Sequence, residues 1–215
     1  MTMTRRSMLA GLGTLALASP AHPAGAGDLS LFGTQSRQLP GIGKFPKWQG
    51  TLQKYFGEQA LERAPCDAQR RRFGQCQRAE WQTFLASLAG KGADEQIVAV
   101  NAWLNAARYV VDPVNWTVPD YWSTPEEFLR KKGDCEDYAI TKFMSLRSLG
   151  YDQNFMRVVV LQDQNLNLAH AVLALERQSD FLILDNQIAE PVSDTRIRHY
   201  KPIYSVNETN WWLHR

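Results

Sequence analysis

Cys135 lies in the run Gly133-Asp134-Cys135-Glu136-Asp137-Tyr138, at the expected start of a helix. A sulfur atom there lies near unpaired backbone N–H groups and the positive end of the helix dipole, and both favour thiolate over thiol. His170 and Asp185 follow on two apolar segments that are typical of neighbouring strands. This order predicts a nucleophilic thiol, with His170 as the base that takes its proton and Asp185 as the carboxylate that orients the imidazole.

The register of the two strands decides whether His170 and Asp185 meet, because cross-strand partners share one face of a sheet. A turn that closes Leu175 on Asp180 places the two side chains opposite each other. A turn one residue longer places Asn186 opposite the histidine instead. We expect the first register, or a bulge with the same effect.

Three carboxylates flank the expected nucleophile, from Asp134, Glu136 and Asp137. Hard oxygen ligands of this kind suit calcium, but the same residues can instead cap the helix start without any metal. Uncompensated carboxylates oppose thiolate formation at Cys135. Our hypothesis is therefore that a bound cation restores the nucleophile electrostatically as well as ordering the loop.

The periodicity of apolar residues predicts helices before the nucleophile and an antiparallel meander after it. Helices are expected over residues 81–88, 96–111, 125–129 and 135–149, with Ser123 or Thr124 as the cap of the third and Gly150 at the end of the last. Strands are expected over residues 155–161, 168–175 and 181–185, coil over 28–46 and an aromatic loop over 113–125. The expected fold class is α+β, with N-terminal helices and a nucleophile helix packed on an antiparallel sheet.

Several side chains near the nucleophile have more than one candidate role. The backbone N–H of Cys135 is the expected first donor to an oxyanion. Trp116, or a backbone group near it, is a candidate second donor, and Trp122 is a candidate lining residue of a substrate groove, although both can equally fill core. Asn101 and Asn105 are four residues apart on an expected helix, and we expect them to hydrogen-bond at a buried edge rather than act in catalysis.

The N-terminal segment 1–26 is typical of a secretory signal. The pair Arg5-Arg6, a short apolar run up to Ala18 and small residues predict export, of a twin-arginine kind, with cleavage near position 18 or 26. The apolar run is too short to span a bilayer, and an uncleaved N-terminal anchor is the alternative. Residues 27–215 are expected to form a single domain.

The charge balance argues against a nucleic-acid partner. Loss of Arg5 and Arg6 with the leader reduces the 24 basic residues to 22, which equals the number of acidic residues, 22. The sequence has no basic stripe interleaved with aromatic residues, and the cluster at 70–72 is typical of a solvated loop. We expect a mature chain that neither binds nucleic acid nor spans a membrane.

Cysteine usage is consistent with an exported protein. Cys66 and Cys76 lie ten positions apart and predict a disulfide, which leaves Cys135 as a free thiol. The alternative, in which one of them pairs with Cys135, would silence the nucleophile. The helix-start position of Cys135 fits a reactive thiol better than a structural one.

Five segments together resemble a known family. They are residues 133–140 (GDCEDYAI), 170–173 (HAVL), 184–186 (LDN), 120–125 (DYWSTP) and 204–208 (YSVNE) followed by Trp211-Trp212. This set is similar to the bacterial transglutaminase-like cysteine proteases of the LapG type. The resemblance covers most of the chain from about Trp48 onward.

The resemblance implies a papain-like or transglutaminase-like fold, a periplasmic location and calcium dependence, with Asp134, Glu136 and Asp137 as the candidate ligands. It implies cleavage of a large surface adhesin near its N-terminus, at a pair of alanines, which controls biofilm attachment. It also implies inhibition by an inner-membrane receptor that senses cyclic di-GMP. Two other functions stay open: a transglutaminase or amidase that passes the acyl group to an amine, and a non-catalytic calcium-dependent binding module in which Cys135 is structural.

Overall fold

The computed structural model describes residues 30–61, 65–72 and 75–215. The expected signal segment 1–26 and its cleavage positions lie outside these residues. Within them, no helix is both long enough and apolar enough to cross a membrane.

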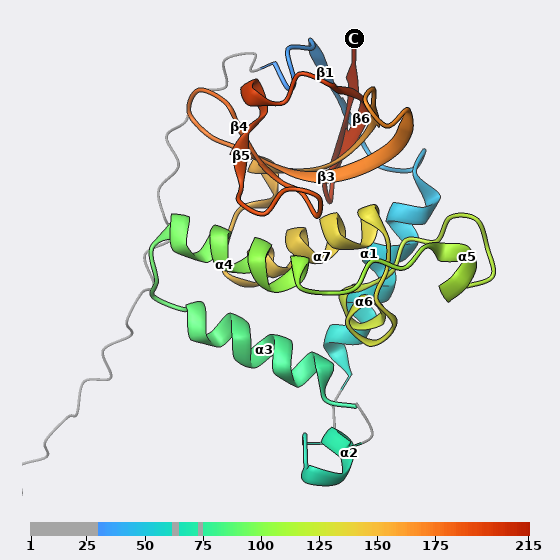
Figure 1. The fold of residues 1–215 in the computed structure, drawn as a ribbon, viewed down its shortest axis with the longest axis vertical. Coiled ribbons are helices and arrows are strands. Elements are labelled where there is room, and N and C mark those ends of the chain that lie inside the picture. The colour runs from blue at the N-terminus through green and yellow to red at the C-terminus, as the bar shows by residue number, and fades with distance from the viewer. Residues whose placement is uncertain (1–29, 62–64, 73–74) are drawn as a thin grey trace, which may run out of the picture.

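Among the described residues, seven strands form an antiparallel sheet on one side of the fold, in the order β1-β7-β6-β2-β3-β4-β5 (Figure 1). The strands are β1 (Ser36–Pro40), β2 (Met156–Asp163), β3 (Leu168–Glu176), β4 (Phe181–Leu184), β5 (Val192–Ser193), β6 (Tyr200–Val206) and β7 (Asn210–His214). The predicted meander of β2, β3 and β4 is confirmed. The prediction of coil over 28–46 is wrong at β1, because this short polar segment pairs with β7 at the far end of the chain.

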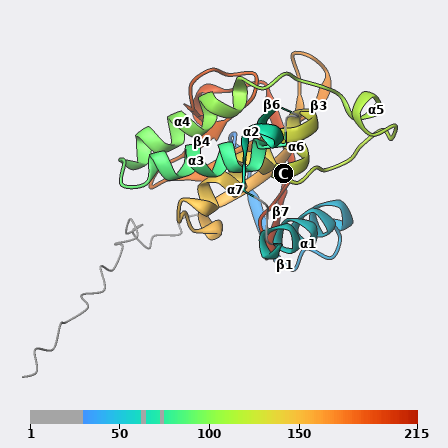
Figure 2. The same ribbon diagram turned by 90° about the horizontal axis from the view of Figure 1, so that it is seen from below.

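In the described part of the chain, most of the sheet is preceded by the helices α1 (Pro46–Ala60), α2 (Ala68–Arg72), α3 (Gln77–Leu88), α4 (Ala93–Asn105), α5 (Asp112–Asn115), α6 (Pro125–Lys131) and α7 (Cys135–Ser148). Two short 3-10 turns lie at Gln153–Phe155 and Asp194–Arg196. Figures 1 and 2 together show α1 on one flank of α7 and α4 on the other. Helix α7 packs against β3 and β2 and therefore lies directly beneath the middle of the sheet.

Several helix boundaries differ from the sequence prediction: α3 and α4 begin earlier, at Gln77 and Ala93, and α6 continues to Lys131. Helix α4 ends at Asn105, not near Val111, because the following residues form an extended segment instead. Tyr109 pairs with Gly133 in a parallel bridge, and the N–H of Val110 donates to the carbonyl of Gly133 over 2.8 Å. The aromatic loop also contains the single-turn helix α5. This pairing brings the aromatic loop alongside the segment that leads into Cys135.

The start of α6 follows the predicted capping pattern. The hydroxyl of Thr124 accepts from the N–H of Glu127 over 3.3 Å, and the Glu127 carboxylate accepts from the N–H of Thr124 over 3.0 Å. This reciprocal capping box satisfies two backbone donors that the helix leaves unpaired. Of the two candidate caps, Thr124 is therefore the one used.

The sheet separates two apolar cores. On the helix side, Leu173 and Leu175 of β3 pack with α7 residues such as Phe143. On the opposite face, Val172 and Ala174 join a smaller core with Tyr200 and Phe181, among others. Because side chains alternate along a strand, His170 belongs to the face of this smaller core.

The turn between β3 and β4 is two residues out of the expected register. Glu176 pairs with Phe181, and the turn is closed by the N–H of Arg177 donating to the carbonyl of Asp180 over 2.9 Å. The favoured closure of Leu175 on Asp180 is therefore wrong. A two-residue shift preserves the face on which each side chain lies. Asp185, just past the end of β4, consequently still faces the same side as His170.

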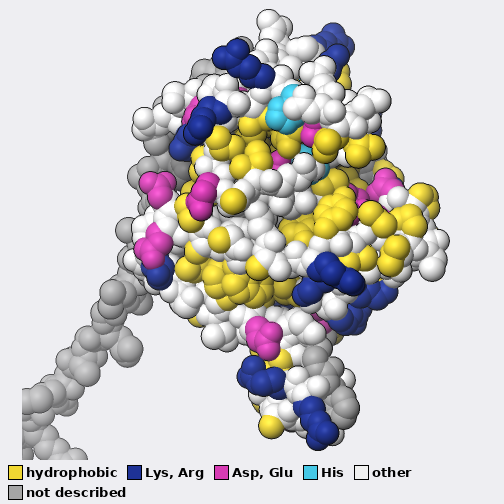
Figure 3. Space-filling model, viewed as in Figure 1, with side chains coloured by type: hydrophobic (Ala, Val, Ile, Leu, Met, Phe, Trp, Pro, Cys, Tyr) yellow, Lys and Arg dark blue, Asp and Glu magenta, His cyan; other side chains and the backbone are white. Residues whose placement is uncertain are grey.

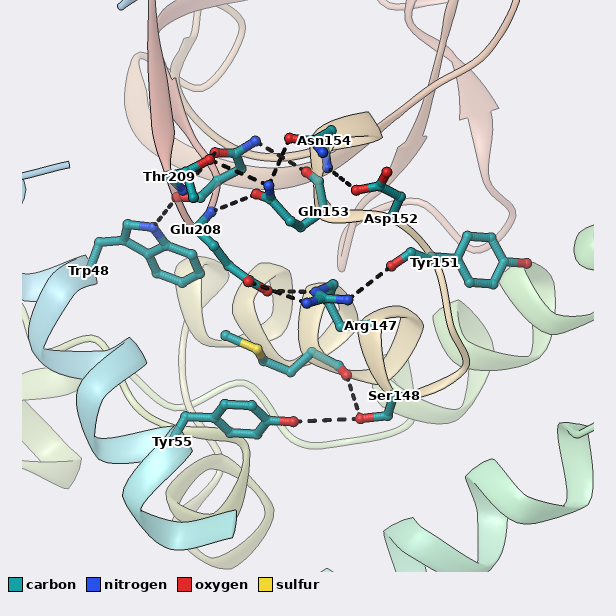
Figure 4. A network of polar contacts seen from close by, with 12 residues as sticks. Trp48, Tyr55, Arg147, Ser148, Tyr151, Asp152, Gln153, Asn154, Glu208 and Thr209 are labelled. Atoms are coloured by element: carbon teal, nitrogen blue, oxygen red, sulfur yellow. Dashed lines mark hydrogen bonds and ion pairs between the residues drawn. The ribbon is translucent and has the colours of Figure 1, made fainter. Parts of the chain in front are cut away.

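The C-terminal end of α7 is anchored to the hairpin between β6 and β7 (Figure 4). The Arg147 guanidinium pairs with Glu208, with Nε and Oε1 2.6 Å apart. The indole N–H of Trp48 donates to the carbonyl of Asn207 over 2.7 Å. The Arg147–Glu208 pair thus fixes α7 at the end opposite to Cys135, and the Trp48 bond ties α1 to the same hairpin.

Candidate active site

The thiol of Cys135 lies at the first residue of α7, as predicted. It is partly exposed and free of any disulfide. Its sulfur donates to Glu136 Oε2 over 3.2 Å, and it also accepts a hydrogen bond from the backbone N–H of Ala171. Ala171 directly follows His170, so the sulfur contacts the segment of β3 that carries the residue expected to be its base.

His170 and Asp185 meet in the smaller core. His170 Nε2 lies 3.0 Å from Asp185 Oδ1, and only 4% of the surface of His170 and 1% of that of Asp185 is exposed. The sequence prediction that these two side chains converge is confirmed. The remaining oxygen, Asp185 Oδ2, accepts from the hydroxyl of Tyr200 over 2.7 Å. Asp185 Oδ1 also accepts from the backbone N–H of Gln187 over 2.9 Å.

These hydrogen bonds determine the charge of Asp185. Burial alone raises the pKa of a carboxyl group, but donation from His170, Gln187 and Tyr200 outweighs it and holds the pKa of Asp185 below its usual value. The carboxylate is therefore ionised at neutral pH. An ionised Asp185 can only accept, so Nε2 of His170 carries a hydrogen and Nδ1 is the nitrogen left to take a proton.

Two asparagines on α4 hold the loop that carries Asp185. Asn105 Nδ2 donates to the carbonyl of Asp185 over 2.8 Å and to that of Ile188 over 3.2 Å. Asn101 Nδ2 donates to the carbonyl of Ala189 over 2.8 Å. The predicted hydrogen-bonding role of both asparagines is confirmed, and it fixes loop 185–189 against α4.

Five carboxylates converge beside the nucleophile. Asp112, Asp134 and Asp137 bring ligand oxygens within 4.8 Å of one another, and so do Asp112, Asp120 and Glu136. Asp134, Glu136 and Asp137 are the three predicted ligands. Asp112, at the start of α5, and Asp120, in the aromatic loop, join them because the Tyr109–Gly133 bridge brings this part of the chain alongside. Asp112 lies two residues beyond the bridging segment, a position that sequence periodicity does not reveal.

The cluster has unpaired acceptors that fit a cation. Oδ1 of Asp112, Oδ1 of Asp134 and Oδ2 of Asp137 are buried and lack any hydrogen-bond partner. Helix capping does not use Asp134, because its side chain accepts no cap hydrogen bond. Buried, unpaired and mutually close carboxylate oxygens are the donor set that calcium prefers, and pure capping does not account for them.

Electrostatics at this cluster affect both the acids and the thiol. Burial raises the pKa of Asp137 to about 8 and that of Asp112 to about 6, and neighbouring carboxylates add to both shifts. Burial together with the adjacent carboxylates likewise raises the pKa of Glu136. The pKa of the Cys135 thiol is raised first by burial and then by Glu136 and Asp134. Without a compensating cation, the cluster therefore opposes the thiolate, as the sequence analysis expected.

Trp116 and Trp122, the candidate oxyanion and groove residues, both pack against other aromatic side chains. Trp116 packs on Tyr121, with ring centroids 4.3 Å apart, and the Lys131 ammonium lies 3.7 Å from the centroid of its ring. Trp122 is buried in the main core against Trp48. Trp122 thus fills core, the alternative left open for it, while an oxyanion role for Trp116 stays a prediction. The side chain found beside the backbone N–H of Cys135 is that of Tyr109, whose hydroxyl accepts from it.

Other parts of the molecule lie apart from this site. Cys66 and Cys76 form the predicted disulfide, with Cα atoms 5.5 Å apart. A groove over α3 and α4, on the face rich in apolar side chains in Figure 3, is lined by residues such as Leu85, Gln96 and Leu149. The groove meets the C-terminal end of α7, which lies about 20 Å from Cys135 at the helical rise of about 1.5 Å per residue.

A free thiol at a helix start and an imidazole held by a buried carboxylate, on helices packed against an antiparallel sheet, are features of the transglutaminase-like α+β class. The profile of the bacterial transglutaminase-like cysteine proteinases (BTLCP) matches residues 66–214. The chain belongs to this family and is a cysteine protease of the LapG type. A comparison with curated protein sequences gave no match.

Solved structures of LapG from Legionella pneumophila share the fold. One is 28% identical, covers 76% of this chain and 85% of its own, and superposes with a TM-score of 0.60. A calcium-bound form is 28% identical over 77% of this chain and 87% of its own, with a TM-score of 0.60. An EGTA-treated form is 27% identical over 82% of this chain and 88% of its own, with a TM-score of 0.61.

Proposed function

We propose that this chain is an exported, calcium-dependent endopeptidase that uses Cys135, His170 and Asp185 to cut a large surface adhesin near its N-terminus, at a pair of alanines. Release of the adhesin would end biofilm attachment. The hydrogen-bonded pair of His170 and Asp185 beside a free helix-start thiol carries this proposal. Family membership and the sequence motifs support the substrate class.

The residues divide the chemistry as follows. The Cys135 thiol transfers its proton to His170 Nδ1 and attacks the scissile carbonyl, while Asp185 stabilises the imidazolium through Nε2–H. The backbone N–H of Cys135 donates to the developing oxyanion. His170 then gives the proton to the leaving amine, and water hydrolyses the thioester with His170 again acting as base.

We propose that the five-carboxylate cluster holds calcium, with Asp112, Asp134 and Asp137 as ligands and Glu136 and Asp120 at its margin. The unpaired buried oxygens of the first three support this assignment. Calcium has been bound to a LapG that shares this fold. When bound, the ion would supply positive charge that offsets the carboxylates next to the thiol.

The function is tested by incubating purified protein with fragments of candidate adhesins, with calcium or with EGTA, and sequencing the product ends. We expect calcium-dependent cleavage at a di-alanine site that is lost in Cys135→Ala. Ser87→Ala changes an exposed side chain on α3 and serves as the control that keeps activity. Labelled amine in the same reaction separates the functions: its incorporation in place of hydrolysis would overturn the protease assignment in favour of transamidation.

We further propose that the mature protein lies in the periplasm and is held inactive by an inner-membrane receptor that binds cyclic di-GMP. This rests on the resemblance of the motifs to the family. Cell fractionation and size-exclusion chromatography with the receptor's periplasmic domain test the two statements separately. Retention of the protein in the cytoplasm, or the absence of a complex at micromolar concentrations, would contradict them.

A further inference from the structure

Gln187 covers the nitrogen of His170 that the proposed chemistry needs. Its amide Nε2 lies 3.4 Å from His170 Nδ1, while its backbone N–H donates to Asp185 Oδ1 over 2.9 Å. Gln187 is exposed, whereas His170 is buried. One residue therefore contacts both the imidazole, at Nδ1, and its carboxylate.

The direction of this hydrogen bond follows from Asp185. Because the ionised carboxylate accepts from Nε2–H, the neutral imidazole has its lone pair on Nδ1. The Gln187 amide must then face Nδ1 with its NH2 group. This contact favours the tautomer with hydrogen on Nε2, which is the one that can accept the thiol proton at Nδ1. The contact also occupies the Nδ1 lone pair that would accept this proton.

The position of Gln187 is fixed although its side chain is exposed. Strand β4 ends at Leu184, and residue 187 lies in the bend that follows it. Asn105 holds the backbone on both sides of it, through the carbonyls of Asp185 and Ile188. The backbone that carries the Gln187 side chain is therefore held by α4.

The thiol is engaged elsewhere at the same time. Cys135 donates to Glu136 Oε2 over 3.2 Å, so neither half of the expected thiol–imidazole pair is free. The leaving amine of a substrate must also approach Nδ1, because this nitrogen returns the proton to it. Gln187 therefore stands where the leaving-group side of the substrate arrives.

We propose that Gln187 is a positioning residue that caps Nδ1 of His170 in the resting enzyme and yields this nitrogen when substrate enters. The inference rests on the proposed function of His170 as the base. When the cap opens, the proton on Cys135 passes to Nδ1, which gives a thiolate and an imidazolium. The same proton later moves from Nδ1 to the leaving nitrogen as the C–N bond breaks and the thioester forms.

The test compares the wild-type enzyme with Gln187→Met, which keeps the side-chain length but has no amide, and with Gln187→Glu. The readouts are the rate of Cys135 alkylation by iodoacetamide against pH, and the pKa of His170 from NMR of labelled imidazole. Gln82→Met on the exposed face of α3 is the matched control. Thermal unfolding of each variant verifies that the fold is kept. Gln187→Asn, which keeps the amide on a shorter side chain, is measured in the same way.

We expect Gln187→Met to speed alkylation at neutral pH by about 2- to 10-fold, the factor that one ordinary hydrogen bond supplies. Gln187→Glu should raise the pKa of His170 above that in Gln187→Met, because a carboxylate at Nδ1 favours the imidazolium. Unchanged alkylation and an unchanged His170 pKa in both variants would overturn the inference. Because alkylation needs no adhesin, this failure is distinct from failure of the protease proposal, which Cys135→Ala tests.

Discussion

Tyr200→Phe isolates the hydrogen bond that Tyr200 donates to Asp185. The variant keeps the ring, which is 5% exposed in the smaller core, and removes only the hydroxyl that lies 2.7 Å from Asp185 Oδ2. A hydrogen bond to a charged group contributes about 1.5–3 kcal/mol. We therefore expect the free energy of unfolding at pH 7 to fall by about 1.5–3 kcal/mol, with a loss in Tm of roughly 3–12 °C.

The control is Tyr151→Phe, which removes a hydroxyl that donates to a neutral acceptor. Tyr151 is 3% exposed, and its hydroxyl lies 3.1 Å from the carbonyl of Ala93, far from the site. Loss of a neutral hydrogen bond costs about 0.5–1.5 kcal/mol. Urea unfolding of both variants and the wild type, at several pH values, measures the two losses under the same conditions.

The pH dependence gives the sharper outcome. The pKa of Asp185 is lowered in the folded protein, so its stabilisation is complete above the unfolded value of about 3.9 and is lost as the pH falls through the lower folded value. The deficit of Tyr200→Phe should therefore shrink in acid, while that of Tyr151→Phe stays constant. Equal deficits for both variants at every pH would refute an ionised Asp185 held by Tyr200.

Three further predictions concern the nucleophile segment and its acids. A Cβ on Gly133 would lie 2.7 Å from both Cβ and Cγ of Asp137. Gly133→Ala should therefore lower the free energy of unfolding, measured in urea, by about 1–3 kcal/mol and weaken calcium binding. A fully stable variant would contradict this packing. Asp112→Asn should weaken calcium binding, measured by calorimetry, at least about tenfold, because it removes one charged ligand. The exposed control Asp152→Asn should keep the calcium affinity of the wild type. Equal affinities of Asp112→Asn and the wild type would remove Asp112 from the site. Chelator-treated protein should be less stable at pH 8 than at pH 5. The pKa of Asp112 is raised to about 6 and that of Asp137 to about 8, so both carboxyl groups destabilise the fold as they ionise. Thermal scans at the two pH values check this, and greater stability at pH 8 would contradict it.

Local patterns were enough to predict that Cys135 begins a helix and that His170 and Asp185 meet. The helix start at Cys135 is determined by neighbouring residues, and the alternation of β3 sets the face of His170. Even the wrong register left His170 and Asp185 together, because the error was an even number of residues.

Long-range pairing accounts for what the sequence could not reveal. The strand β1 has no apolar alternation, and it exists because residues 210–214 supply a partner edge. Tyr200 reaches Asp185 only because β6 pairs with β2, which orders its start beside the smaller core. Asp112 and Asp120 join the cluster through the contact of Tyr109 with Gly133, where the predicted continuation of α4 would have placed them elsewhere.

The two halves of the proposed catalytic pair are held by different partners. The thiol is bonded to Glu136, within the acidic cluster, while Nδ1 of His170 is bonded to Gln187, on a loop fixed by α4. On this proposal, neutralising the acidic cluster frees the Cys135 thiol, and movement of Gln187 frees Nδ1 of His170. The hydrogen bonds of Gln187 and of Glu136 involve different partners. Independent perturbations add in free energy, so calcium and Gln187→Met should multiply each other's effects on the alkylation rate of Cys135. A combined rate no greater than the larger single effect would instead mean that one event already releases both atoms.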